Sequence, residues 1–196
     1  MSTRRQFIGG AICVAASVSA SAALALSLLD NARGPRLPIG RVVFDGRFAA
    51  ARSFGDEAER RGFATSSIEG RIQELWYRDL FYRWRDEKLP TAGMTDARTL
   101  FLLEMMAKDA GMRVVHRIHH LDIDGASTHQ VFGLLARRAE LSAKMADGRN
   151  PWSARAADIV LQWPNSARST AASESDIQKA RLQALDTQAL VSWILC

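Results

Sequence analysis

Short apolar runs alternate with amphipathic stretches through the first half of the chain, and this alternation constrains the fold more than any other feature. In the amphipathic stretches, apolar residues recur at three- and four-residue steps, which is typical of helices with one buried side. The expected strands are residues 41–44, 63–68, 91–94 and 112–115, and the expected helices are residues 47–61, 71–87 and 96–109. Strands that alternate with helices predict an α/β domain with a largely parallel sheet.

The pattern changes after residue 115. Residues 116–123 and 126–134 are strand-like and flank Asp124-Gly125, a dipeptide typical of a tight hairpin turn. We therefore expect an antiparallel β-hairpin that extends the fourth strand. The remaining expectations are helices at 135–147 and 152–162, a loop at 164–173, a helix capped by Ser173 or Ser175 that ends near Leu185, and a strand or helix end at Leu190 to Leu195.

These segments together predict one α/β domain of three layers. Its sheet is expected to be mostly parallel, with about four strands, helices on both faces and the antiparallel β-hairpin as an extension. The third helix of the alternating part begins at Thr95 or Asp96, because both residue types favour the N-cap position.

The N-terminal segment carries two adjacent arginines ahead of a long uncharged stretch. Residues 3–8 are Thr-Arg-Arg-Gln-Phe-Ile, and no charged residue occurs from Ile8 to Leu29. Through Arg4, Arg5 and Phe7 this segment resembles the twin-arginine signal of exported bacterial proteins. The resemblance implies the Tat translocase as a partner and transport of an already folded protein. Such cargo often holds a cofactor or travels with a partner that does, so an exported redox enzyme is a second expected partner, although cofactor-free cargo also exists.

Small residues near Ala25 indicate where the leader is cut. Ala-Ser-Ala at 20–22 and Ala-Leu-Ala at 23–25 both have the small-x-small pattern of a signal-peptidase site. We expect a signal peptide at residues 1–25, a Gly- and Pro-containing linker at 26–39 and a single α/β domain at 40–196. Cleavage predicts a periplasmic protein. An uncleaved leader, which is about as long as a spanning helix, predicts a protein anchored to the inner membrane.

The charge distribution does not favour nucleic acid as a partner. The chain has a formal net charge of +5, but its densest basic cluster, between Arg78 and Lys88, is interleaved with acidic residues. A nucleic-acid-binding surface more often shows a sustained patch of one sign. Of the two cysteines, Cys13 lies in the leader, so a cleaved chain keeps only Cys196 and forms no internal disulfide.

The carboxyl ends of the expected parallel strands are the candidate binding site, because ligands of open α/β sheets bind beyond these ends. Glycines there let a ligand approach the backbone, Arg47 can pair with a carboxylate or phosphate, and Asp45 can accept a hydrogen bond from a hydroxyl. Thr95 and the first N–H groups of the next helix can hold an anion. The predicted ligand-binding residues are Asp45, Gly46, Arg47, Gly93, Thr95 and Asp96. The alternative interpretation is that they are ordinary turn and capping residues.

Other chemistry-bearing motifs are weaker. The hairpin places His120 opposite His129, with His116 on the face of His120, and two imidazoles across a ribbon can hold a metal. An exposed ribbon with polar rings explains them equally well, and we predict no metal site. The sequence contains no G-x-G-x-x-G after Phe44, no P-loop and no G-x-S-x-G elbow, and it indicates no particular cofactor.

Two aromatic residues are candidates for a contact surface. Tyr77 and Tyr82 fall off the main apolar stripe of the expected helix at 71–87.

Two classes of function follow. The favoured one is a non-catalytic periplasmic domain that binds a small ligand or accompanies an exported redox enzyme, because no catalytic constellation is recognisable. The alternative is an enzyme that acts on a small anionic or hydroxylated substrate at the strand ends, with Asp45, Arg47 and Thr95 involved.

Overall fold

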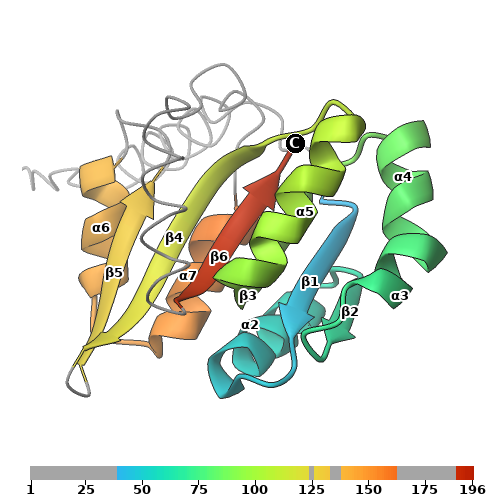
Figure 1. The fold of residues 1–196 in the computed structure, drawn as a ribbon. Coiled ribbons are helices and arrows are strands. Elements are labelled where there is room, and N and C mark those ends of the chain that lie inside the picture. Colours follow the sequence, from blue (N-terminus) through green and yellow to red (C-terminus); the bar gives the residue numbers. More distant parts are fainter. Residues whose placement is uncertain (1–38, 124–125, 133–137, 163–188) are drawn as a thin grey trace, which may run out of the picture. The chain divides into compact units, whose positions relative to one another are not determined.

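One open sheet of six strands organises the unit Pro35–Cys196, the larger of two units in this computed structural model (Figure 1). The structure describes residues 39–123, 126–132, 138–162 and 189–196. The strands, in the spatial order β2-β1-β3-β6-β4-β5, are β1 (Arg41–Asp45), β2 (Thr65–Ile68), β3 (Thr91–Asp96), β4 (Val114–Ile123), β5 (Ala126–Phe132) and β6 (Leu190–Leu195). The helices are α2 (Ala49–Arg60), α3 (Gln73–Leu75), the π-helical turn η1 (Trp76–Leu80), α4 (Phe81–Asp86), α5 (Ala97–Asp109), α6 (Arg138–Ala146) and α7 (Trp152–Leu161).

The sequence correctly predicts the mixed α/β class and the alternating elements of the first half. β1 pairs in parallel with β2 on one side and with β3 on the other. The Asp96 carboxylate caps α5 by accepting a hydrogen bond from the Thr99 N–H at 2.7 Å, as expected for one of the two candidate caps.

The predicted sheet of about four mostly parallel strands is wrong in the number of strands and in the share of parallel pairings. Among the described strands, three of the five pairings are antiparallel. The reason is β6, which lies between β3 and β4 and runs antiparallel to both, so that β4 does not pair with β3. The apolar pattern of Leu190–Leu195 fits a strand, but local pattern carries no information about which strands it joins.

The hairpin prediction is confirmed by the pairing of β4 with β5. Ile123 pairs with Ala126, and His120 pairs with His129. The turn residues 124–125 lie outside the described residues, as do the leader, the expected loop at 164–173 and the expected helix that follows it.

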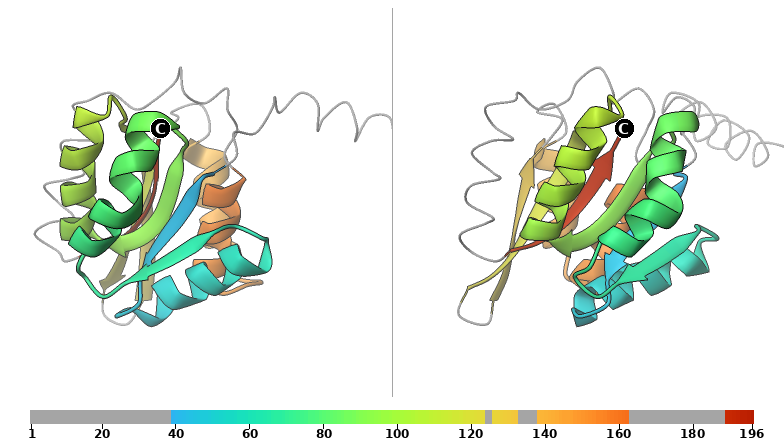
Figure 2. Two further views of the ribbon diagram at one scale, coloured as in Figure 1. Left: turned by 90° about the vertical axis from the view of Figure 1, so that its right-hand side faces the viewer. Right: turned by 45° about the vertical axis from the view of Figure 1, so that its right-hand side comes forward.

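Apolar side chains form a separate cluster on each face of the sheet. Val42 and Val43, neighbours on β1, belong to different clusters because successive side chains of a strand point to opposite faces. Residues of α2, α6 and α7 join the first cluster, and residues of η1, α4 and α5 join the second. Figure 2 shows α4 and α5 over one side of the sheet and α2 and α7 over the other.

The expected helix at 71–87 is interrupted by a π-helical turn. Trp76–Leu80 forms η1 between the short helices α3 and α4, and α4 ends at Asp86, two residues before Lys88, whose φ is 50°. Trp84 of α4 is fully buried and donates its indole N–H to the Thr91 hydroxyl at 2.8 Å. No helix in the described part of the chain is long and apolar enough to span a bilayer.

Candidate functional site

The direction of chain winding reverses between β1 and β3, and the surface beyond the carboxyl ends of these two strands is called the crevice. After β1 the chain enters α2, which packs on the first cluster, and after β3 it enters α5, which packs on the second cluster. The connections therefore leave β1 and β3, adjacent parallel strands, toward opposite faces of the sheet. Such a switch point is where ligands of open α/β sheets bind.

Asp45 is the last residue of β1 and is fully buried. Its carboxylate accepts hydrogen bonds from Nε of Arg47 at 3.0 Å and from Nη2 of Arg47 at 2.6 Å. The backbone N–H of Arg47 also donates to this carboxylate, at 3.2 Å. A carboxylate removed from water in this way needs such charged partners.

Arg47 bridges the two strand ends. Its Nη2 also donates to Asp96 at 2.7 Å, so one guanidinium connects the end of β1 with the end of β3. The hydrogen bond that Arg47 donates to Asp45 is the main cause that raises the pKa of Arg47 above its ordinary value. Burial alone would raise the pKa of Asp96, but the hydrogen bonds from Thr99 and then Arg47 outweigh it and lower the pKa of that carboxyl.

Two further contacts fix the position of the guanidinium. Its Cζ lies 5.3 Å from the centroid of the Phe48 ring, a cation–π distance. On another side it lies against Gly70, where a Cβ would collide with it. Gly70 has φ of +71°, so glycine is required there both by the backbone and by the guanidinium. Nη1 of Arg47 has no hydrogen-bond partner among the described residues, and the side chain is 44% exposed.

The remaining predicted residues divide into two groups. Gly46 lies at the crevice, where a Cβ would meet the side chains of Ser67 and Glu69. Gly93 and Thr95, in contrast, are buried in β3 and face Trp193 of β6.

Gly93 and Thr95 position β6 on the sheet. The Thr95 hydroxyl accepts the indole N–H of Trp193 at 3.0 Å. A Cβ at Gly93 would collide with the Val43 carbonyl and with the Trp193 ring. The structure therefore brings Asp45, Gly46, Arg47 and Asp96 together at the crevice. Phe48 and Gly70 also lie at the crevice. Of these two residues only Gly70 had a sequence signal, because a glycine directly after an expected strand indicates a turn.

A second Asp-Gly-Arg tripeptide in the chain has the same local geometry. At Asp147-Gly148-Arg149, Nε of the arginine donates to both oxygens of Asp147 at 3.0 Å, and its backbone N–H donates at 3.2 Å. Arg149 is 86% exposed and makes no ion pair beyond Asp147 among the described residues. Local pairing is thus intrinsic to the tripeptide, whereas burial of Asp45 and the bridge to Asp96 are specific to the crevice.

His120 is buried and His129 is half-buried, rather than both being exposed on a ribbon. Nδ1 of His120 lies 3.0 Å from Nδ1 of His129, and Nε2 of His120 lies 3.0 Å from the Ser192 hydroxyl. Trp152 of α7 stacks on His120 at 4.5 Å, which explains why the exposed-ribbon interpretation is wrong. Burial, and then the neighbouring imidazoles, lower the pKa of His120. The described residues contain no group of three or more potential metal ligands.

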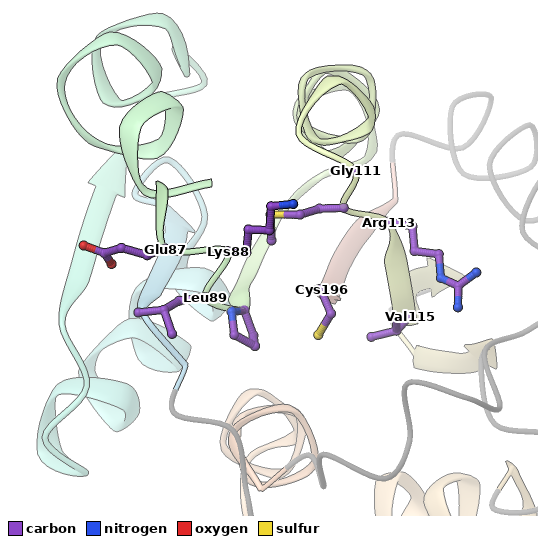
Figure 3. Close-up of a pocket in the computed structure, with 9 residues that line it drawn as sticks. Glu87, Lys88, Leu89, Gly111, Arg113, Val115 and Cys196 are labelled. Atoms are coloured by element: carbon purple, nitrogen blue, oxygen red, sulfur yellow. The ribbon is translucent and has the colours of Figure 1, made fainter. Parts of the chain in front are cut away.

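A cavity of about 580 Å³ lies where β3 and β4 begin and β6 ends (Figure 3). It is lined by Glu87, Lys88, Leu89, Pro90, Gly111, Met112, Arg113, Val115 and Cys196. Its charged side chains are all exposed, so they lack the burial that would hold them in one orientation toward a ligand. The crevice, which holds a buried carboxylate and a fixed guanidinium, is the better candidate site.

Comparison with protein families, curated proteins and solved structures finds no match for this chain.

Proposed function

We propose that this chain is an exported α/β domain that binds a small hydroxylated ligand in the crevice between β1 and β3. The guanidinium of Arg47 carries the proposal. Asp45 and Asp96 hold it in one orientation, and its Nη1 is left with N–H donors for a ligand oxygen. A side chain that is already fixed loses little conformational entropy on binding, which favours affinity.

The charges around the crevice favour a neutral ligand over a strongly anionic one. The carboxylates of Asp45, Asp96 and Glu69 outnumber the guanidinium groups of Arg47 and of Arg52, which donates to the Gly46 carbonyl. A phosphate would meet this excess of negative charge. A sugar or polyol both donates and accepts hydrogen bonds, and the ring of Phe48 offers an apolar face beside Arg47.

Binding is better supported than catalysis at this site. The carboxylate of Asp45 is fully buried and accepts three kinds of hydrogen bond from Arg47. An enzyme that used Asp45 would need this carboxylate to reach the substrate, whereas a binding protein needs it only to hold Arg47.

We further propose that the domain has three layers, with helices on both faces of the sheet.

We also propose that the leader directs the chain through the Tat translocase to the periplasm. A periplasmic role beside an exported redox enzyme is a second form of the proposal, and it predicts a co-purifying enzyme. A reporter fused downstream of residue 40 should reach the periplasm, and changing both Arg4 and Arg5 to Lys should keep it in the cytosol. Unchanged export of that variant would contradict the proposed route.

Binding is tested on protein recovered from the periplasm. Native mass spectrometry should find a small bound molecule, or binding after incubation with a panel of sugars and polyols. Arg47→Lys keeps the charge beside Asp45 but loses the bidentate geometry, so it should lose the ligand. Arg149→Lys is the matched control and should bind normally. If no panel member binds, or if both variants bind as the wild type does, the crevice is not the site.

A further inference from the structure

The outer face of the segment from α3 to α4 is rich in exposed aromatic residues. Tyr77 is 72% exposed, Tyr82 is 52% exposed and Phe81 is 38% exposed. The two other large hydrophobic residues that are exposed in the described part of the chain, Leu102 and Met105, lie on α5, which packs on the same face of the sheet. Exposed apolar residues that gather on one side of a molecule indicate an interaction surface.

These rings are held in place by contacts that reach into the core. Trp76 makes edge contacts with the buried Trp84 at 5.5 Å and with Phe81 at 5.6 Å. Phe81 in turn contacts Tyr82 at 5.3 Å, and the guanidinium of Arg85 lies over both rings. Rigid aromatic side chains lose little entropy when a partner covers them, so this face is suited to docking.

The exposed residues of this face form a symmetric series. Glu74, Tyr77, Arg78, Phe81, Tyr82 and Arg85 are all exposed, and the steps between them are three, one, three, one and three residues. An antiparallel second copy centred between Asp79 and Leu80 would therefore place Glu74 opposite Arg85, Tyr77 opposite Tyr82 and Arg78 opposite Phe81. These pairings are an ion pair, an aromatic pair and a cation–π pair, and each occurs twice.

We propose that a second copy of this chain docks on this face, with the two helical segments antiparallel about a two-fold axis. A two-fold interface requires a surface that is complementary to itself, and the symmetric series meets that requirement. Residues 73–86 contain three basic and three acidic residues, so two copies do not repel each other. Stable dimers bury about 800 Å² per partner, and Leu102 and Met105 of α5, on the same face of the sheet, are further exposed apolar residues. No residue of this surface belongs to the crevice, so the dimer and the ligand proposal are tested independently.

The first test is a charge swap. Light scattering on the purified chain should give twice the mass that mass spectrometry gives for the denatured chain. Glu74→Arg and Arg85→Glu each turn two attractive pairs into repulsive ones, and each should weaken the dimer by about tenfold or more. The double variant restores opposite charges and should recover the dimer. A monomeric wild type at the highest soluble concentration would overturn the proposal, even if another protein were found bound there. Failure of the double variant to recover would overturn the antiparallel register.

The second test traps the predicted neighbours. Tyr77→Cys combined with Tyr82→Cys, in a background of Cys13→Ser and Cys196→Ser, should give a disulfide-linked dimer under mild oxidation. Ala139→Cys with Lys144→Cys on α6 is the control, because these residues are exposed and have the same spacing. Equal cross-linking of the two pairs, or none at positions 77 and 82, would contradict the docking geometry.

Discussion

The role of Arg47 as the partner of a buried carboxylate can be tested by removing its side chain. In Arg47→Ala, Asp45 would keep its buried position at the end of β1 but lose the guanidinium hydrogen bonds at 2.6 and 3.0 Å. Asp96 would lose the same guanidinium, while its hydrogen bond from Thr99 would remain. The variant therefore isolates the effect of the guanidinium on the junction of β1 and β3.

The expected loss of stability follows from how deeply Asp45 and Arg47 are each buried. Removing one partner of a fully buried ion pair destabilises a protein by about 3–5 kcal/mol. The Arg47 side chain is 44% exposed, so water replaces part of what is lost and solvent already screens the pair. The backbone N–H of residue 47 also continues to donate to Asp45. We therefore expect Arg47→Ala to lower the free energy of unfolding by about 2 kcal/mol.

Urea unfolding followed by tryptophan fluorescence measures this change, since Trp84 and Trp193 are fully buried. The midpoint should fall by about 1 M urea with an unchanged slope. Arg149→Ala is the matched control, because it removes the same local pairing at an exposed tripeptide and should leave the midpoint unchanged. Equal midpoints for the two variants would refute the argument, since burial of Asp45 would then add nothing to the pairing.

Three further predictions concern single positions. Lys88→Gly should stabilise the chain by about 0.5–1 kcal/mol in the same assay, because φ is 50° at Lys88, two residues after the end of α4, and glycine adopts this conformation without strain. Gly70→Ala should destabilise more than Gly111→Ala, since both have positive φ but only Gly70 lies against the Arg47 guanidinium. Burial lowers the pKa of His119 to about 3, so below pH 6.5 the unfolded chain takes up a proton that the folded chain does not. Stability should therefore fall between pH 6.5 and 3, by about 1.4 kcal/mol per pH unit from this group, and His119→Gln should flatten that dependence.

Local sequence signals were sufficient to predict the strands whose pairing partners are close in sequence. β1, β2 and β3 alternate with helices, and the parallel pairing of β1 with β2 and with β3 agrees with what that alternation predicts. The β4–β5 hairpin likewise follows from one turn dipeptide.

Signals of this kind fail where contacts are distant in the chain. β6 is fixed beside β3 by groups such as Trp193 and Thr95, which are 98 residues apart. The burial of His120 has the same origin, because the ring that covers it, Trp152, comes from a different element. A hydropathy pattern can show that a residue faces one side of a strand, but it cannot show whether a helix will cover that side.

The same distinction governs the candidate site. Asp45-Gly46-Arg47 and Asp147-Gly148-Arg149 have equal residues and similar local hydrogen bonds, so the tripeptide alone could not separate them. What separates them is the long-range neighbour: β3 lies beside β1 and brings Asp96 within 2.7 Å of Arg47. That neighbour exists because the chain reverses its winding between these two strands. The topology of the sheet, rather than the tripeptide, therefore converts a common turn into a site with a fixed guanidinium.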